Sequence, residues 1–548
     1  MLTNDLDRLP PDMRTAMTGP GSPFELTRED VRGVPMTVFA RRPAHLPALL
    51  LAAAEQHTDR PYLLFPDRQL TYKETVDQIP AVAAALRQVH GVRRGDRVAV
   101  VGPNSPEYAL TLWAVAWLGA ISVSLNGWWT GTEMRHGLAL AQPRLLIGEE
   151  RQLSRLDDGP GVPTLTFAEL FASLTPGTAG VPVEPDLVED DAVSILFTSG
   201  TTGRPKGAVI THRGLVNFAQ DSQLRGYTEA IVSGQTDPPP GPPVALVVSP
   251  FFHISGLAPL MAGGPFNGMT MVFPPRGRWD PELHLELTAR YGVTQWSGVP
   301  TQLLRLLRMC QADPGRYDVS TLRTIGMGGA PISTELAVLL GSVIPNARPA
   351  QGFGMSETCG QGTTIAGARM VAHPQSVGLP TPTSELALRD VDGQGIGEIC
   401  LRTPSIFLGY WGDPAATDAV LDADGWYRTG DYGRIVDGML QLESRLRDMI
   451  IRGGENIYPI EIENRLSEHP DLLDAAVIGV PHDELGQEVM AVVVARDGAG
   501  LSAADVQEWA GRVLAPFKVP AHVRFVDALP YSATGKLLKR ELEKQVAA

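Results

Sequence analysis

A run of glycines and hydroxyl side chains, closed by one lysine, follows an apolar segment of the chain. It reads Ser194-Ile-Leu-Phe-Thr-Ser-Gly-Thr-Thr-Gly-Arg-Pro-Lys-Gly207. Its glycines allow backbone N–H groups to approach an anion closely, and these are Gly200, Gly203 and Gly207. Hydroxyl donors and a mobile positive charge come from Thr198, Ser199, Thr201, Thr202 and Lys206. This composition indicates a phosphate cradle, and the ligand we expect is a nucleoside triphosphate.

Two other interpretations of this run can be weighed against the cradle. A Walker-type phosphate loop needs Gly, four residues and then Gly-Lys-Ser/Thr. In the frame that begins at Gly200, Pro205 stands in place of the second glycine and Gly207 in place of the magnesium-binding hydroxyl. The Walker motif therefore fails, and an ordinary surface turn rich in Gly and Thr remains the alternative.

The composition of the chain indicates a globular protein of at least two domains. It has 548 residues, of which 43% are hydrophobic and 20% are charged. The formal net charge of −15 argues against a general nucleic-acid binder and against binding to anionic membranes. Residues 516–548 reverse this balance with six basic and three acidic residues, which fits either a solvated helix end or a functional basic patch.

The cysteines and the chain start favour a reducing cytoplasm. Only three cysteines occur, without C-x-x-C spacing, so neither a zinc site nor a disulfide framework is indicated. The first residues carry acids and prolines where a signal peptide would need a basic start and an apolar run.

One uncharged, mostly apolar run, residues 108–129, has the length of a membrane span. We interpret it instead as a helix followed by a strand. Ser105 is a suitable N-cap, Pro106 suits the first helical position, and Gly119 provides a stop before the strand-like residues 120–125. No transmembrane segment is therefore expected.

Short β-type runs alternate with helical patterns over roughly the first 430 residues. This alternation predicts an α/β fold with several subdomains and mostly parallel sheets. Glycine- and proline-rich residues 157–186 and 233–243 read as loops. We predict a large N-terminal domain over residues 1–443, a hinge at 444–447 and a small α+β domain at 448–548. In that small domain the patterns predict helices at 460–467 and from Ser502 to about Leu514, and strands at 475–480 and 489–494.

Seven further stretches occur in a fixed order around the glycine-rich run. They are residues 249–256 (SPFFHISG), 328–331 (GGAP), 351–358 (QGFGMSET), 427–431 (YRTGD), 444–448 (SRLRD), 452–459 (RGGENIYP) and 532–536 (SATGK). Together they resemble the adenylate-forming superfamily of acyl-CoA synthetases, luciferases and peptide-synthetase adenylation domains. The resemblance covers the chain from about residue 45. It implies a two-step ligase: a carboxylate attacks the α-phosphate of ATP to give an acyl-adenylate and pyrophosphate, and a thiol then displaces AMP.

The resemblance also implies the parts of an ATP site. Glu357 is the expected Mg²⁺ carboxylate with Thr198 beside it, Thr198 and Thr201 contact the β- and γ-phosphates, and Ser356 keeps the hydroxyl of the family's usual threonine. Asp431 would accept hydrogen bonds from the ribose hydroxyls, and Arg445 would hold the ribose or phosphate side. Phe353 keeps the adenine-stacking ring of the usual tyrosine without its hydroxyl. The other expected members of the ATP site are Gly329, Ala330, Pro331, Gly352, Gly354 and Met355.

Four more roles follow from the resemblance. Lys536 is the expected catalytic lysine, which reaches the site from the small domain and neutralises charge during adenylation. His253 occupies the aromatic position that borders and gates the acyl pocket, and no catalytic base is required because a carboxylate is already ionised at neutral pH. Arg447 occupies the hinge about which the small domain rotates between the two steps, although Ser444 replaces a glycine often seen there. Gly453 and Gly454 would line the pantetheine tunnel for CoA.

The expected acid is hydrophobic, either a fatty chain or a bulky polycyclic acid. Amino-acid-activating relatives usually carry an aspartate where this chain has His253, which disfavours an amino-acid substrate. The candidate acyl pocket consists of His253, Ile254, Trp296, Gly298, Val299, Gly328 and Gly352. The expected partners are this acid, ATP with Mg²⁺, and CoA, and a homodimer stays open. The alternatives are an acyl-AMP ligase that loads an acyl-carrier protein, an aryl-acid CoA ligase, and a non-catalytic binding protein on the same fold.

Overall fold

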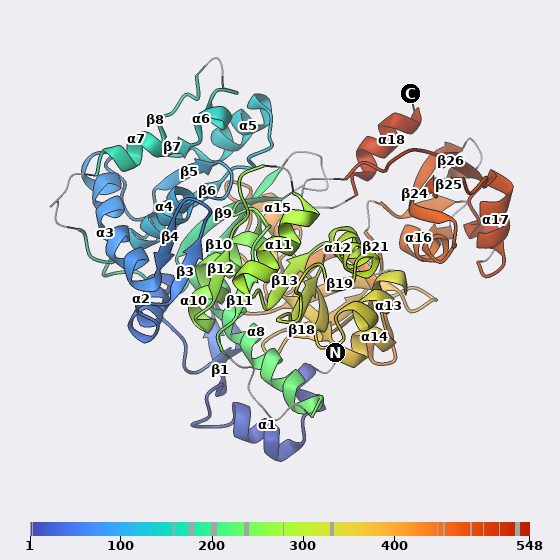
Figure 1. Ribbon diagram of the computed structural model, residues 1–548, viewed down its shortest axis with the longest axis horizontal. Coiled ribbons are helices and arrows are strands. Elements are labelled where there is room, and N and C mark those ends of the chain that lie inside the picture. The colour runs from blue at the N-terminus through green and yellow to red at the C-terminus, as the bar shows by residue number, and fades with distance from the viewer. Residues whose placement is uncertain are drawn as a thin grey trace.

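The computed structural model consists of two large sheets with helices between and outside them, and a smaller sheet near the C-terminus (Figure 1). It describes residues 2, 4–156, 159–174, 180–198, 205–234, 241–277, 279–328, 334–445, 448–452, 455–482, 485–496, 498–514, 516–531 and 537–547. A two-stranded hairpin, β1 (Leu26–Val31) and β2 (Val34–Phe39), lies near the N-terminus.

The first large sheet has six strands in the order β10-β9-β6-β5-β7-β8. Its strands are β5 (Arg97–Val101), β6 (Ile121–Ser124), β7 (Leu145–Gly148), β8 (Thr164–Thr166), β9 (Ala192–Thr198) and β10 (Lys206–Thr211). All neighbours are parallel except β9 and β10, which form an antiparallel pair. The parallel arrangement predicted for this part of the chain is therefore confirmed.

The second large sheet has 13 strands in the order β18-β19-β20-β21-β17-β16-β15-β14-β13-β11-β12-β3-β4. The run from β3 through β12, β11, β13 and β14 to β15 is parallel, whereas the strands from β15 to β18 are antiparallel. The strands are β3 (Pro61–Leu64), β4 (Gln69–Thr71), β11 (Val244–Leu246), β12 (Thr270–Val272), β13 (Gln295–Gly298), β14 (Thr324–Met327), β15 (Arg348–Gly354), β16 (Gly362–Ala366), β17 (Ser376–Pro380), β18 (Glu385–Arg389), β19 (Gly397–Arg402), β20 (Tyr427–Val436) and β21 (Met439–Arg445). The sheet is thus mixed, and short connections join the antiparallel pairs β18–β19 and β20–β21.

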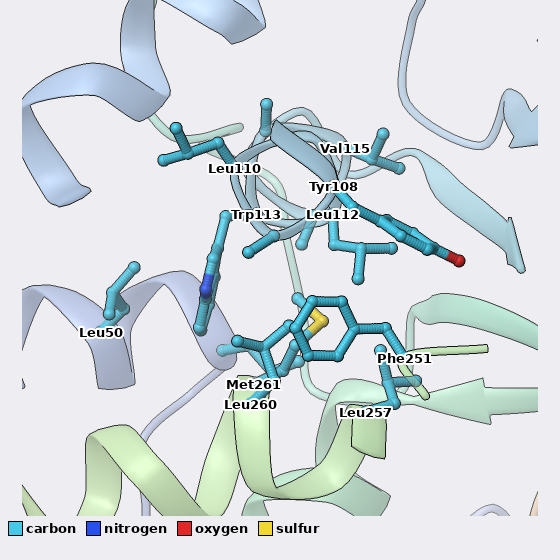
Figure 2. Packing of buried hydrophobic residues seen from close by; sticks show 14 of the residues in the cluster. Leu50, Tyr108, Leu110, Leu112, Trp113, Val115, Phe251, Leu257, Leu260 and Met261 are labelled. Atoms are coloured by element: carbon cyan, nitrogen blue, oxygen red, sulfur yellow. The ribbon is translucent and has the colours of Figure 1, made fainter. Parts of the chain in front are cut away.

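Helices cover these sheets. They are α1 (Pro11–Thr18), α2 (Leu46–Gln56), α3 (Tyr72–Gln88), α4 (Pro106–Trp117), α5 (Gly131–Ala141), α6 (Glu150–Leu153), α7 (Phe167–Ala172), α8 (His212–Val232), α9 (Ile254–Ala258), α10 (Gly264–Asn267), α11 (Pro281–Tyr291), α12 (Pro300–Ala312), α13 (Thr334–Val343), α14 (Gly367–Ala372) and α15 (Pro414–Asp418). The main hydrophobic core joins residues of both sheets through α2, α3, α4 and α8. In Figure 2, Trp113 of α4 lies between Leu50 of α2 and the pair Leu260 and Met261.

The apolar run at residues 108–129 folds as the sequence predicts. The Ser105 hydroxyl caps α4 by accepting a hydrogen bond from the Tyr108 amide at 3.1 Å, and Gly119 follows the helix with a φ of +64°. Strand β6 begins directly afterwards, so the run is buried as core helix and core strand. Among the described residues, no helix is both long and apolar enough to cross a membrane.

The prediction that residues 157–186 form only loop is wrong. Strand β8 and helix α7 lie within this range. Thr166 and Glu169 form a capping box at the start of α7, while Phe167 and Leu170 are buried. Local capping and two apolar contacts therefore overrode the glycine- and proline-rich flanks.

Residues after β21 form a separate unit, which Figure 1 shows as its own lobe. Its five-stranded sheet contains β22 (Ile450–Arg452), β23 (Glu455–Ile457), β24 (Leu472–His482), β25 (Gly486–Ala495) and β26 (His522–Phe525). Its helices are α16 (Pro459–Ser467), α17 (Ala503–Gly511) and α18 (Lys539–Ala547). The helix and strand predictions for this region are confirmed, although α17 ends at Gly511 rather than near Leu514. The predicted hinge residue Arg447 lies outside the described residues.

Candidate functional site

The two ends of the glycine-rich run lie side by side. Thr198 ends β9 and Lys206 begins β10, and the two residues face each other across the antiparallel pair. The run therefore connects two strands as a hairpin, whereas a Walker loop connects a strand to a helix. Helix α8 begins only after β10, with the Thr211 hydroxyl accepting a hydrogen bond from the Gly214 amide at 3.0 Å.

Glu357 lies on a tight turn after β15. Residues Ser356–Thr358 form one turn of 3-10 helix, followed by Cys359 and Gly360 with positive φ angles of 52° and 80°. The Gly360 amide donates to the Met355 carbonyl at 2.7 Å and closes the turn. Glu357 is only 6% exposed, so its carboxylate is held in place by its surroundings.

Tyr410 connects Glu357 to the glycine-rich hairpin. Its hydroxyl donates a hydrogen bond to Glu357 Oε1 at 3.0 Å, and Lys206 Nζ lies 4.9 Å from the centre of its ring. Residues 408–411 run along β10, with the Leu408 amide donating to the Val209 carbonyl and the Trp411 amide to the Gly207 carbonyl. The segment around Tyr410 thus extends the first sheet and carries the tyrosine to the carboxylate.

The electrostatics of this cluster keep its tyrosines neutral. Burial raises the pKa of Tyr410 above its ordinary value, and the neighbouring Glu357 carboxylate raises it further. Burial also raises the pKa of Tyr427, with smaller contributions from Glu357 and Asp431. Both hydroxyls are therefore hydrogen-bond donors at neutral pH.

Asp431 lies on β20, the strand that begins with Tyr427. It is 7% exposed and faces Arg445 across the β20–β21 pair. Gly430, with a φ of +71°, donates its amide to Glu398 Oε1 at 3.1 Å, and the Asp431 amide donates to the Thr429 hydroxyl at 3.1 Å. This local turn fixes the aspartate beside Tyr427. The side chain of Arg445 lies outside the described residues.

Strand β15 presents two different faces. Gly352 and Gly354 are exposed, whereas Phe353 between them is 8% exposed and packs among Val377, Leu401 and Leu440. Met355 is half-buried and Ser356 is buried in the following turn. Stacking of Phe353 on adenine remains a prediction, and it would use the small part of the ring that is exposed.

A row of small side chains crosses four strands of the second sheet. Ser297 on β13 pairs with Gly326 on β14, which pairs with Ala350 on β15, which in turn pairs with Ala366 on β16. Gly328 and Gly352 continue the same face. Gln295 on this face pairs with Ala245, which belongs to the core between the two sheets. The face that carries these small side chains, here called the bare face, is therefore turned towards the first sheet.

The prediction that the Trp296 side chain lines the acyl pocket is wrong. Trp296 is fully buried on the opposite face of β13, packed against α11 and α12, and its indole N–H donates to the Thr288 hydroxyl at 2.9 Å. Gly298 lies on that same face, where an added Cβ would approach Gln302 Oε1 to 3.2 Å. The neighbouring residue Ser297 is exposed on the face that carries the small side chains.

His253 and Ile254 lie near the turn that carries Glu357. His253 caps the short helix α9, and its Nδ1 lies 2.8 Å from the Ser255 hydroxyl and 3.3 Å from the Ser255 amide. A Cβ added to Gly360 would lie 3.5 Å from Ile254 Cγ1. Val299 is half-buried at the start of α12. The predicted roles of these residues in an acyl pocket remain predictions.

Several predicted site residues lie outside the described residues. They are Ser199, Gly200, Thr201, Thr202, Gly329, Ala330, Pro331, Arg447, Gly453, Gly454 and Lys536. Their roles likewise remain predictions.

A single carboxylate is suited to the expected metal. The described residues contain no group of three or more His, Cys, Asp or Glu side chains able to hold a metal ion by themselves. Mg²⁺ in nucleotide sites is usually bound by one or two carboxylates together with the substrate phosphates. Glu357, a hard oxygen ligand near Thr198 and Lys206 of the hairpin, fits that manner of binding.

Sequence reasoning missed Tyr410, whose hydroxyl contacts Glu357. Tyr410 lies 53 positions from Glu357, and the only local signal is a pair of aromatic residues in the glycine-flanked segment Gly409–Gly412.

Comparisons with known proteins agree with this arrangement. Residues 50–411 match the sequence model of AMP-binding enzymes, and residues 461–536 match that of the AMP-binding enzyme C-terminal domain. The chain is 34% identical over 500 residues to a feruloyl-CoA synthase from Amycolatopsis sp., covering 87% of this chain and 94% of the relative. It is also 34% identical over 523 residues to the 3-[(3aS,4S,7aS)-7a-methyl-1,5-dioxo-octahydro-1H-inden-4-yl]propanoyl:CoA ligase of Mycobacterium tuberculosis, covering 91% and 98% of the two chains.

A solved structure has the same architecture. The O-succinylbenzoate coenzyme A synthetase from Bacillus subtilis, in complex with ATP and magnesium ion, superposes with a TM-score of 0.77 at 29% identity. The match covers 90% of this chain and 99% of that one.

Proposed function

Because the chain belongs to the AMP-binding enzyme family and is an AMP-forming acid–thiol ligase, we propose that it activates a bulky, hydrophobic carboxylic acid. A fused-ring acid is the preferred substrate in this proposal, ahead of a long fatty chain. The enzyme uses ATP and Mg²⁺ and takes CoA as its co-substrate. The products are the acyl-CoA, AMP and pyrophosphate.

In the first step, adenylation of the acid, each residue of the site has a separate role in the proposal. The acid, ionised at neutral pH, attacks the α-phosphorus of ATP, and the bond to pyrophosphate breaks. Glu357 would hold Mg²⁺, which supplies positive charge to the triphosphate. Lys206 and Thr198 lie at the base of the hairpin that would grip the β- and γ-phosphates. Asp431 would accept hydrogen bonds from the ribose hydroxyls and so orient the nucleotide.

The second step needs a different arrangement around the same acyl-adenylate. We propose that residues 448–548 rotate about the hinge at 444–447 between the steps. Lys536 would neutralise charge during adenylation, and Gly453 and Gly454 would line the path of the CoA thiol afterwards. The thiol then attacks the acyl carbon, and AMP leaves.

The bare face of β13 to β16 is the observation that carries the substrate proposal. Strands lie about 4.8 Å apart, so the row from Ser297 to Ala366 is roughly 14 Å wide. A flat surface of this width suits a ring system, whereas a single alkyl chain would leave most of it uncovered. The relative from Mycobacterium tuberculosis, whose name specifies a fused bicyclic acid, supports the same choice.

The test is a comparison of acids in ATP–pyrophosphate exchange. We expect kcat/KM to be highest for fused-ring propanoic acids, lower for fatty acids and aryl acids, and lowest for amino acids. A higher value for ferulic or benzoic acids than for fused-ring acids would contradict the proposal and favour the aryl alternative.

The thiol is tested separately with the preferred acid. Transfer to free CoA is expected to exceed transfer to a phosphopantetheinyl carrier protein. Efficient carrier loading without acyl-CoA release would replace CoA by a carrier protein in the proposal.

We also propose a reducing cytoplasm as the compartment. Cys310, Cys359 and Cys400 are free and buried. Burial raises the thiol pKa of Cys310 and of Cys400 to about 11 and that of Cys359 to about 12, so all three remain neutral thiols. Cell fractionation with an antibody to the native protein tests this location, and recovery with secreted proteins would contradict it.

A further inference from the structure

Arg32 occupies the tip of the β1–β2 hairpin in a backbone conformation that arginine seldom adopts. Val31 pairs with Val34, so the turn consists of Arg32 and Gly33 alone, with φ angles of +54° and +88°. Two-residue turns of this kind strongly favour Asn, Asp or Gly, and a left-handed conformation is strained for an ordinary residue. The arginine side chain makes contacts that can offset this strain.

Those contacts lie on the segment that carries Tyr410. Arg32 Nη2 donates to the Ile406 carbonyl at 2.9 Å, and Nη1 donates to the Phe407 carbonyl at 3.3 Å. The Phe407 amide in turn donates to the Glu357 carbonyl at 2.9 Å. Arg32 is thus connected through one residue to the backbone of Glu357.

Phe407 also connects the segment to both tyrosines of the site. Its ring packs edge-on against the rings of Tyr410 and Tyr427, with distances between ring centroids of 5.0 Å and 5.4 Å. Gly409, with a φ of +124°, and Gly412, with a φ of +68°, leave the following backbone little intrinsic stiffness. Tyr410 is held on one side by the hydrogen bonds of its segment to β10 and on the other by the packing of Phe407.

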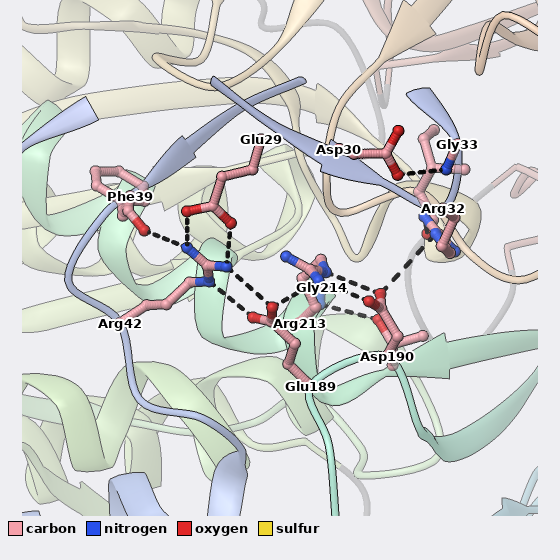
Figure 3. Close-up of polar contacts among 12 residues, drawn as sticks. Glu29, Asp30, Arg32, Gly33, Phe39, Arg42, Glu189, Asp190, Arg213 and Gly214 are labelled. Atoms are coloured by element: carbon pink, nitrogen blue, oxygen red, sulfur yellow. Dashed lines mark hydrogen bonds and ion pairs between the residues drawn. The ribbon is translucent and has the colours of Figure 1, made fainter. Parts of the chain in front are cut away.

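An ion-pair network fixes the hairpin from which Arg32 reaches out (Figure 3). Arg42 at the end of the hairpin pairs with Glu29 at 2.7 Å and with Glu189 at 2.7 Å. Arg213 in the first turn of α8 pairs with Glu189 and with Asp190, both at 2.6 Å. Asp190 lies 3.9 Å from Arg32 Nε and completes the connection. Three arginines and three carboxylates thus balance in charge and tie the hairpin to the base of β9.

We propose that Arg32 is a positioning residue for the Mg²⁺ carboxylate. By holding the carbonyls of Ile406 and Phe407, it keeps the Tyr410 hydroxyl and the Phe407 amide on Glu357. This inference rests on the proposed function, because it takes Glu357 to be the magnesium ligand. The hairpin of residues 26–39 is accordingly a part of the nucleotide site, although it lies far from that site in the sequence.

The test uses Arg32→Gly, which removes the guanidinium and suits the left-handed backbone, so the variant is expected to fold. Calorimetry measures ATP affinity with and without Mg²⁺. Loss of hydrogen bonds from a charged donor is expected to reduce the Mg²⁺-dependent gain in affinity by about 5- to 50-fold. The Mg²⁺ concentration for half-maximal pyrophosphate exchange should rise in parallel, and Arg32→Lys should recover part of both.

Arg28→Ala is the matched control. Arg28 lies on the same hairpin and donates to the Pro35 carbonyl at 2.9 Å, but it does not reach the segment of Tyr410. It should leave both Mg²⁺ readouts unchanged. An Arg32→Gly enzyme with wild-type Mg²⁺ dependence would overturn the inference, whatever its melting temperature.

Failure of the proposed function gives a different result. Wild-type protein that binds ATP with Mg²⁺ but exchanges pyrophosphate with no acid would contradict the substrate proposal, and Arg32 would still be judged by calorimetry. If the ATP affinity of the wild-type protein is the same with and without Mg²⁺, the proposed role of Glu357 as magnesium ligand is contradicted, and the inference with it.

Discussion

Tyr410 shows how one hydroxyl can define the geometry of a buried carboxylate. It donates to Glu357 Oε1 from a segment that is itself held by β10 and by Arg32. This hydrogen bond holds the carboxylate in the position from which Glu357 would contact a metal ion. Lys206 on the far side of the ring adds positive charge near the expected phosphates.

Tyr410→Phe is therefore expected to weaken the metal-dependent step. A hydrogen bond to a charged group contributes about 1.5–3 kcal/mol, so kcat/KM for ATP should fall by roughly 10- to 100-fold. Because the pKa of Tyr410 is raised, its own ionisation should not limit activity below pH 10. Steady-state kinetics at several Mg²⁺ concentrations measure the effect.

Tyr317→Phe serves as the matched control, since Tyr317 makes the same kind of hydrogen bond to Glu282 at 3.1 Å on the surface. It should leave kcat/KM unchanged. Equal effects of the two variants would argue against a special role for Tyr410.

At the scale of elements, neighbouring residues of one strand lie on opposite faces of the sheet and have different roles. Trp296 anchors β13 to the outer helices, whereas Ser297 lies on the bare face. Trp296→Phe should lower the free energy of unfolding by about 1–3 kcal/mol, through lost packing and the lost hydrogen bond to the Thr288 hydroxyl, and leave acid preference unchanged. Ser297→Leu should keep the stability and raise KM for a fused-ring acid.

Denaturant unfolding measures the change in stability, and steady-state kinetics with several acids measures the change in acid preference. A change of acid preference in Trp296→Phe, with none in Ser297→Leu, would mean that the substrate lies on the other face of the sheet.

Elements with strong local signals could be predicted from the sequence. The Ser105 cap and Gly119 stop define α4, and the capping box of Ser502 defines the start of α17. The motifs predict that Glu357 and Asp431 share one site, and the structure places both near Tyr427. Tyr410 and Arg32 could not be identified, because their roles arise from contacts between segments more than 50 positions apart. The face of Trp296 depends on strand register, which local sequence does not specify.

At the scale of the whole molecule, the two units meet at a buried carboxylate. Glu443 on β21 is 3% exposed and pairs with Arg434 Nε at 2.6 Å. Glu461 and Lys518 of the C-terminal unit, themselves paired at 2.7 Å, also act on it. Burial raises the pKa of Glu443 to about 7, Arg434 and Lys518 oppose the rise, and Glu461 adds to it.

A raised carboxyl pKa makes stability depend on pH in a definite direction. The folded state binds the proton more tightly, so this contribution is complete below the ordinary glutamate pKa of 4.5 and is lost as the pH rises through 7. Glu443→Gln should therefore be more stable than wild type at pH 8, by about 1–3 kcal/mol, and should lose this advantage towards pH 5. Melting temperatures across this range provide the measurement.

Glu508→Gln, which alters an exposed ion pair with Arg512, is the control. Its melting temperature should depend on pH as that of the wild type does. If the melting temperature of Glu443→Gln changes with pH in the same way as that of the wild type from pH 5 to pH 8, Glu443 does not titrate in this range.

The most direct test of the account is mass-spectrometric identification of the products formed from ATP, Mg²⁺, CoA and an equimolar mixture of fused-ring, fatty and aryl acids. We expect the fused-ring acyl-CoA to dominate, with an equal amount of AMP, and Glu357→Gln to form none. Release of ADP in place of AMP, acyl-CoA formation by Glu357→Gln, or a dominant aryl-CoA product would contradict the account.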